Sequence, residues 1–135
     1  MLSLRTFIVE DSPIIRDGLV AALEEALPVE VVGTAADEPT AVDWLSRRGA
    51  GCDLMIVDIF LKTGSGLGVL RSAARAGFRG KRIVLTNYAT PDIREACAAL
   101  GADRVFDKSR ELEELISYCA ALAENDGQTH PGALN

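Results

Sequence analysis

The amino-acid sequence predicts a single α/β domain built around a five-stranded parallel sheet. Its 135 residues are enough for about one domain. Short apolar runs rich in β-branched residues alternate with segments of helical periodicity along the whole chain. The runs at 54–57 and 83–85 are apolar on both faces, as interior parallel strands are. Because right-handed crossovers connect such strands through single helices, we expect a doubly wound sheet with helices on both faces.

The predicted strands are the apolar runs at residues 6–9, 29–33, 54–57, 83–85 and 104–106. The first and fourth helices have the clearest ends. Ser12 and Thr90 are typical N-cap residues, and each is followed by a proline at the first helical position. Pro28 ends the first helix and Gly101 ends the fourth.

The remaining helices are placed by apolar residues at helical spacing. The second is predicted from about Pro39 to Gly49 and the third from about Gly66 to Gly77. The fifth is expected to follow a Ser109 cap and to continue through Leu122. Residues 1–124 therefore form the predicted domain. Residues 125–135 lack periodicity and contain glycine and proline, so we expect a flexible tail and no second domain.

Composition excludes several classes of function. With 14 Lys and Arg against 20 Asp and Glu, the net charge of −6 disfavours direct binding to nucleic acid. The longest aliphatic stretch, residues 54–61, is interrupted by Asp58, and the start of the chain lacks a signal-peptide pattern, so we expect neither membrane insertion nor secretion. Cys52, Cys97 and Cys119 form no CxxC pair, which favours buried thiols in a reducing compartment.

Polar residues follow the carboxyl ends of four predicted strands. In an open parallel sheet, this is the edge at which ligands bind. Glu10 and Asp11 follow the first strand and Asp58 follows the third. Thr86 and Lys108 follow the fourth and fifth. If the strand order is 2-1-3-4-5, the three acids lie together, and close carboxylates need a cation to stay ionised. An all-oxygen pocket of this kind suits Mg²⁺.

Such a pocket is suited to phosphoryl transfer, in which positioning and electrostatics do most of the work. Asp58 is the natural nucleophile and would form an aspartyl phosphate, with Lys108 offsetting the negative charge. Simpler interpretations exist for each residue alone. In these interpretations, Asp58 serves only as a turn or cap residue and Lys108 only as a solvated surface lysine. Glu10 and Asp11 serve only to favour the N-terminus of the following helix.

The motifs, taken in order, resemble the receiver domain of two-component response regulators, with a flavodoxin-like fold, over about residues 4–124. They are IVEDS, LMIVDIF, Gly66-Leu67, IVLTN and GADRVFDKS. The resemblance implies that Glu10, Asp11, Asp58 and the backbone carbonyl of Phe60 bind Mg²⁺. It implies that Asp58 receives phosphate from a sensor histidine kinase or a histidine phosphotransfer protein, and that Thr86 and Lys108 contact the phosphoryl oxygens. It further implies a bacterial cytoplasmic protein that signals and is not an enzyme with its own substrate.

The sequence also departs from the family pattern. Val105 stands where an aromatic switch residue is common, and Ser109 replaces the usual proline after the lysine, which makes a cis peptide bond costly. Lys62 stands at another frequent proline position, and Asn87 replaces a small residue. Phe60 and Tyr88 flank the site, and we hypothesise that they slow attack of water on the phosphoaspartate; a core-packing role for them is the simpler alternative.

Other proteins of this fold class fit less well. A flavin phosphate would be repelled by Glu10 and Asp11, a cobalamin binder would need a histidine two residues after Asp58, and a phosphatase of the haloacid-dehalogenase type would need an acid where Phe60 stands. Two hypotheses remain. One is a single-domain receiver that switches on phosphorylation at Asp58. The other is a degenerate receiver that acts as a phosphorylation-independent interaction module.

A switching receiver must transmit its state to another protein. The resemblance implies that a downstream target, or a second copy of the chain, binds the face formed by the fourth helix, fifth strand and fifth helix. We expect Asp92, Arg94 and Glu95 to be exposed on that fourth helix.

Overall fold

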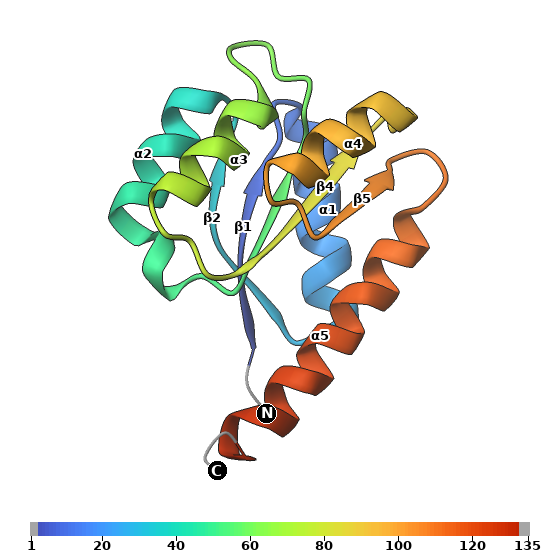
Figure 1. Ribbon diagram of the computed structural model, residues 1–135. Helices are drawn as coiled ribbons and strands as arrows, with labels where there is room; N and C mark the ends of the chain where they lie inside the picture. Colours follow the sequence, from blue (N-terminus) through green and yellow to red (C-terminus); the bar gives the residue numbers. More distant parts are fainter. Residues whose placement is uncertain (1–2, 133–135) are drawn as a thin grey trace.

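The computed structural model describes residues 3–132, with side chains described through residue 125. Five parallel strands form one sheet in the order β2-β1-β3-β4-β5, as predicted (Figure 1). The strands are β1 (Leu4–Val9), β2 (Val29–Ala35), β3 (Leu54–Val57), β4 (Lys81–Thr86) and β5 (Arg104–Asp107). The α-helices are α1 (Pro13–Ala26), α2 (Glu38–Arg48), α3 (Gly66–Arg75), α4 (Pro91–Ala99) and α5 (Leu112–Gly132), and a 3-10 turn, Gly49–Gly51, follows α2.

Two helical layers cover the sheet, with α2, α3 and α4 on one face and α1 and α5 on the other (Figure 1). The central strand β3 is buried along its whole length and supplies side chains to both layers. Met55 and Val57 pack toward α2 and α3, whereas Leu54 and Ile56 pack toward α1 and α5. The unbroken apolar run at 54–57 is therefore explained by burial on two faces.

The helix starts follow the predicted caps in two of the three cases. Ser12 Oγ accepts a hydrogen bond from Ile15 N at 3.3 Å, and Thr90 Oγ1 accepts one from Ile93 N at 3.3 Å. Each cap satisfies a backbone donor that the first turn of the helix leaves unpaired. These bonds fix the starts of α1 and α4 beside the carboxyl edge of the sheet.

The predicted Ser109 cap of the fifth helix is wrong. Ser109 donates to Asp107 Oδ1 from its backbone nitrogen at 2.8 Å and from its hydroxyl at 2.6 Å. Its side chain is thereby held in a local turn, and α5 begins three residues later, at Leu112. The Lys108–Ser109 bond is trans, since no peptide bond between residues 3 and 132 is cis.

The end of the chain is described only in part. Helix α5 runs to Gly132, past residue 124, where we place the end of the domain. Residues 133–135 lie outside the described residues, so the boundary stays a prediction. The predicted burial of the three thiols is confirmed for Cys52, Cys97 and Cys119. Within the described residues, no helix is both long enough and apolar enough to cross a membrane.

Candidate functional site

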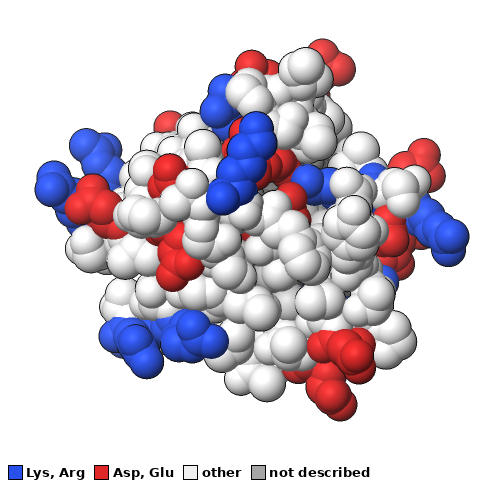
Figure 2. All heavy atoms as spheres, turned by 90° about the horizontal axis from the view of Figure 1, so that it is seen from above, with Lys and Arg blue, Asp and Glu red and all other residues white. Residues whose placement is uncertain are grey.

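The polar residues that follow the strands line one cavity at the carboxyl edge of the sheet. Figure 2 looks down on this edge, where acidic and basic side chains lie close together over the central part of the face. The cavity has a volume of about 190 Å³. It is lined by Glu10, Asp11, Ser12, Ile15, Asp58, Phe60, Thr86, Asn87, Tyr88 and Lys108. All five side chains that we predicted from strand ends are therefore in one place.

Strand pairing explains why the acids meet. Strands β1 and β3 are neighbours, and Val9 on one pairs with Val57 on the other. The next residues, Glu10 and Asp58, therefore leave the sheet side by side, and Asp58 N donates to Val9 O at 3.0 Å. The parallel register thus brings together residues that lie far apart in the chain.

Lys108 forms the central ion pair of the site. Its ammonium Nζ lies 2.8 Å from Asp58 Oδ2 and 2.5 Å from Glu10 Oε1. The three side chains are at most 10% exposed. Burial opposes the charged form of Lys108 most strongly, but hydrogen bonds and charges from Asp58 and Glu10 together outweigh it. The pKa of Lys108 therefore lies above its ordinary value.

The remaining carboxylate oxygens are held by backbone amides. Glu10 Oε2 accepts from Ser12 N at 3.0 Å, and Asp58 Oδ1 accepts from Phe60 N at 3.3 Å. Asp11 Oδ2 accepts from Lys62 N at 2.8 Å, which ties the start of α1 to the loop after β3. Each acid is thus oriented toward the cavity before any ligand is bound.

The acid group has the composition of a divalent-cation site. One oxygen from each of Glu10, Asp11 and Asp58 lies within 4.8 Å of the other two. Among the described residues, Lys108 is the single basic one that lines the cavity, so three carboxylates share one positive charge. This excess of negative charge and the all-oxygen donor set fit Mg²⁺.

Thr86 lies in the wall of the cavity. It is the last residue of β4 and is fully buried. Its hydroxyl oxygen accepts a hydrogen bond from Tyr88 N at 3.3 Å, and its carbonyl accepts one from Lys108 N at 2.9 Å. The ends of β4 and β5 are thereby connected directly behind the ion pair.

Two aromatic side chains stand at the rim. Phe60 is 49% exposed and Tyr88 is 61% exposed, so neither packs in the core. Their rings meet edge to face with centroids 5.1 Å apart. Phe106, in contrast, is a core residue, and Val105 is half-buried with no aromatic ring to switch.

Sequence reasoning did not predict the hydrogen bonds by which Glu38 and Arg94 connect elements around the site. Glu38, on α2, accepts a hydrogen bond from Ser65 N at 2.9 Å across the loop after β3. Arg94, on α4, donates to Ala89 O at 3.0 Å, to Val105 O at 2.9 Å and to Glu111 Oε1 at 3.0 Å. No local pattern distinguishes either residue from a solvated charge, because most of these partners are 11 or more residues away in the sequence.

The fold and the cavity together define a doubly wound α/β domain with an acidic pocket at the carboxyl edge of its sheet. A family model described as the response regulator receiver domain matches residues 6–120, and the chain belongs to that family. The chain is 32% identical over 121 residues to the nitrate/nitrite response regulator protein NarP of Escherichia coli, a match covering 89% of this chain and 55% of that protein. It is also 32% identical to protein-glutamate methylesterase/protein-glutamine glutaminase 5 of Myxococcus xanthus, covering 89% of this chain and 31% of that protein.

Solved structures confirm the fold. The receiver domain of the putative response regulator NarL from Mycobacterium tuberculosis superposes with a TM-score of 0.81 at 21% identity, covering 92% of this chain and 98% of that one. RcsB from Salmonella enterica, solved with promoter DNA and the phosphomimetic BeF3-, superposes with a TM-score of 0.77 at 24% identity. The match covers 93% of this chain and 71% of that one. The chain spans about half the length of the curated relative NarP.

Proposed function

We propose that the chain is a phosphorylatable receiver that accepts a phosphoryl group on Asp58 from a histidine kinase or a histidine phosphotransfer protein. One observation carries this proposal. Asp58 lies at the end of the central strand, is only 7% exposed, faces an open cavity and has the Lys108 ammonium 2.8 Å from its Oδ2. A merely structural aspartate would not need a lysine and two further carboxylates beside it.

The transfer requires one bond to form and one to break. A carboxylate oxygen of Asp58 attacks the phosphorus of a phosphohistidine, and the P–N bond breaks with its electron pair returning to the imidazole. Glu10, Asp11, Asp58 and the Phe60 carbonyl would hold Mg²⁺, and the bound ion would supply positive charge to offset the negative charge of the phosphoryl group. The same Asp58 then carries the phosphate until water hydrolyses it.

Lys108 and Thr86 are proposed to bind the phosphoryl group once it is transferred. Lys108 contacts Asp58 directly, so its ammonium can exchange a carboxylate oxygen for a phosphoryl oxygen. Thr86 supplies a hydroxyl from the adjacent strand end. Movement of these two residues would change the loops after β4 and β5, and with them the position of α4.

Phosphorylation is tested by intact mass. We expect acetyl phosphate with Mg²⁺ to add one phosphoryl group to the wild-type chain and none to Asp58→Asn. Removal of Mg²⁺ with EDTA should abolish the adduct. An unphosphorylated wild-type chain that also fails to bind Mg²⁺ would support the alternative, a degenerate receiver acting as a phosphorylation-independent interaction module.

The phosphodonor is proposed to bind beside the cavity, between α1 and α5. An apolar groove of about 460 Å³ opens there and is lined partly by Lys108 itself. Three of its lining residues are exposed aliphatic side chains, Ile14 at 86%, Ile15 at 40% and Leu112 at 40%, and together they form one apolar patch of the kind that marks interaction sites. A donor domain with an apolar face would bury these residues while presenting its phosphohistidine to Asp58. Replacement of Ile14 by Asp should slow transfer from a kinase and leave transfer from acetyl phosphate unchanged.

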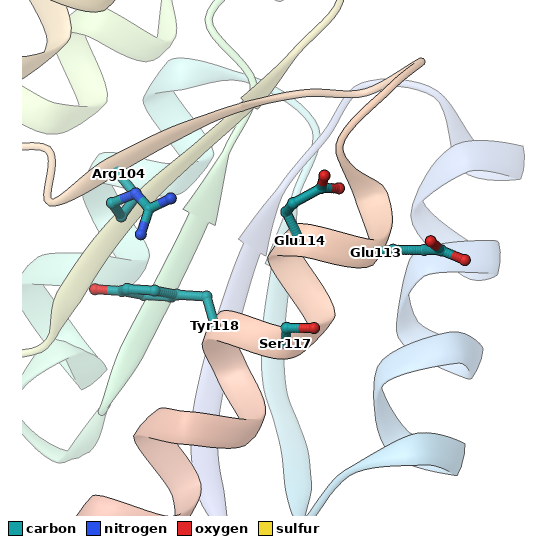
Figure 3. A pocket seen from close by; sticks show the side chains of 5 residues that line it. All are labelled: Arg104, Glu113, Glu114, Ser117 and Tyr118. Carbon is teal, nitrogen blue, oxygen red and sulfur yellow. The ribbon is translucent and has the colours of Figure 1, made fainter.

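The output surface is proposed to include β5 and α5. Arg104, Glu113, Glu114, Ser117 and Tyr118 line a shallow open pocket there (Figure 3). The Arg104 guanidinium lies 5.2 Å from the centroid of the Tyr118 ring, and both charge signs are present on this surface. Asp92, Arg94 and Glu95 on α4 are exposed, as predicted. We propose that a separate protein target, or a second copy of the chain, binds here.

The remaining parts of the proposal concern where the chain acts and on what. The family is a signalling family, and we propose a cytoplasmic signalling protein without an enzymatic substrate of its own. The net charge of −6 supports partners that are proteins rather than nucleic acid. The absence of nucleic-acid binding is checked directly by titrating the protein with a 30-base-pair DNA duplex at low salt. Measurable affinity for the duplex would contradict the proposal that the partners are proteins.

A further inference from the structure

Glu38 connects α2 to the loop between β3 and α3. It is the first residue of α2 and follows the N-cap Asp37. Its Oε1 accepts a hydrogen bond from Ser65 N at 2.9 Å, and its own backbone nitrogen donates to Thr63 O at 3.2 Å. Two bonds in opposite directions therefore join one residue of α2 to the end of this loop, 27 residues further along the chain.

Two glycines make room for the Glu38 side chain. Gly64 has a φ of +81°, a backbone conformation that favours glycine. A Cβ atom on Gly68 would overlap the Glu38 carboxylate, and one on Gly64 would overlap the Glu38 Cβ. The carboxylate thus lies against the first turn of α3, where the helix dipole also favours a negative charge.

The other end of the same loop lies in the acidic cavity. Phe60 N donates to Asp58 Oδ1 and Lys62 N donates to Asp11 Oδ2. An isolated bridge pairs Phe60 with Ser65, so the residue held by Glu38 is directly opposite the residue whose carbonyl is expected at the metal. This pair is the route by which we expect a change at Ser65 to reach Phe60.

The N-cap side chain of α3 is that of Ser65 and not that of Glu38. Ser65 Oγ already accepts a hydrogen bond from Leu67 N at 3.0 Å and serves as the N-cap. The Glu38 contact is made by the backbone nitrogen of Ser65, which belongs to the loop. The bond therefore restrains the point where the β3–α3 loop joins the helix.

We propose that Glu38 is a positioning residue for the metal-binding edge of the site. By accepting from Ser65 N, it fixes the β3–α3 loop so that the Phe60 carbonyl and the Phe60 and Lys62 amides stay in place over Asp58 and Asp11. This inference rests on the proposed function for its metal-binding part. The restraint on the loop itself is a property of the metal-free protein and can be measured separately.

The test compares Glu38→Ala, Glu38→Gln and Gly68→Ala with the control Glu25→Ala, an exposed glutamate near the end of α1. Glu38→Gln keeps an oxygen acceptor for Ser65 N. Gly68→Ala leaves Glu38 in the chain but pushes its flexible carboxylate away, and alanine does not weaken the helix. The first readout is amide hydrogen exchange in the metal-free protein, and the second is Mg²⁺ affinity by titration calorimetry.

We expect Glu38→Ala and Gly68→Ala to speed exchange at Phe60, Lys62 and Ser65 by about five- to tenfold, the loss of one hydrogen bond. We expect both to weaken Mg²⁺ binding by about tenfold, the usual effect of removing a residue that orients a metal ligand. The double variant of Glu38→Ala and Gly68→Ala should be no worse than either single one, and Glu38→Gln and Glu25→Ala should resemble wild type. Gly68→Ala should not lower the melting temperature, which separates positioning from general stability.

Unchanged exchange at Phe60 and Lys62 in Glu38→Ala would overturn the inference, even if Ser65 alone lost protection. So would a Glu38→Gln variant as defective as Glu38→Ala. Absence of Mg²⁺ binding by the wild-type chain would contradict the proposed function instead, and the exchange result would still decide the role of Glu38.

Discussion

Lys108 is the residue on which the metal-free site depends most. It is the cation between Glu10 and Asp58, both nearly buried. Replacement by Met keeps the aliphatic stem but leaves two carboxylates without a counter-charge. We expect unfolding free energy at pH 7 to fall by about 3 kcal/mol, as when one partner of a buried pair is removed. Urea denaturation measures this, with Lys81→Met, an exposed lysine, as control.

Mg²⁺ should restore part of the stability lost in Lys108→Met, because the ion binds the same carboxylates. Equal destabilisation with and without millimolar Mg²⁺ would show that the acids do not form a cation site.

Phe60 and Tyr88 offer a second test at the residue scale. Their exposed rings meet at the rim of the cavity, next to Asp58. If they limit the approach of water, replacement of both by serine should shorten the lifetime of the phosphoaspartate, and we expect a change of about threefold or more. The lifetime is followed by loss of the phosphoryl adduct after the donor is removed. An unchanged lifetime contradicts the shielding hypothesis.

At the scale of elements, two glycines in helices should respond oppositely to alanine. Gly66 begins α3 in close contact with the backbone of Asp58, where a Cβ atom has no room. Gly18, in α1, has nothing within 4 Å of the place where its Cβ would stand. We expect Gly18→Ala to stabilise the protein by about 0.5–1 kcal/mol through helix propensity.

Gly66→Ala should destabilise the protein by about 2 kcal/mol or more, because the obstacle is backbone and not a flexible side chain. Thermal denaturation of the two variants gives the comparison. A stable Gly66→Ala protein would mean that the β3–α3 loop is not held as closely to Asp58 as the structure shows.

The elements differ in how well local sequence predicts them. Ser12 and Thr90 are each followed by a proline, each accepts a hydrogen bond from the third residue of its helix, and both helices start as expected. Ser109 looks like the same signal, but Asp107 two residues earlier accepts both of its donors. Competition between nearby polar groups decided the start of α5, and the cap residue type alone does not reveal it.

At the scale of the whole molecule, buried thiols make stability depend on pH. Burial raises the pKa of Cys52 to about 11 and that of Cys119 to about 12. Their folded pKa values exceed the ordinary thiol value, so the unfolded chain releases these protons first as pH rises. The free energy of unfolding that the protonated buried thiols contribute is fully present below about pH 9. It is lost as the pH rises from about 9 to the folded pKa values.

The Cys119→Ala variant isolates this effect. Its free energy of unfolding should be lower than that of wild type at pH 8, because a buried side chain is truncated. The difference should narrow by about 1 kcal/mol at pH 10, where the unfolded wild-type thiol is ionised. A constant difference between the two pH values would contradict the assigned pKa of Cys119.

The strands and most of the site could be predicted from the sequence, because they depend on local residue patterns and on the order of the strands in the sheet. Alternating apolar runs define the strands, and the strand order brings Glu10, Asp58 and Lys108 to one edge. The hydrogen bonds of Glu38 and Arg94 were not predicted, because they join residues that are 27 and up to 17 positions apart, respectively. Charged residues at helix starts are common on any surface.

The central claim is that Asp58, with a bound cation, receives a phosphoryl group and changes the state of the β4–α4 and β5–α5 region. The most direct measurement is the amide NMR spectrum with Mg²⁺ alone and with Mg²⁺ plus beryllofluoride, a phosphoryl mimic. We predict shifts at Asp58, Thr86 and Lys108 that extend into α4, and none in Asp58→Asn. A wild-type spectrum that is the same in both conditions would contradict the account.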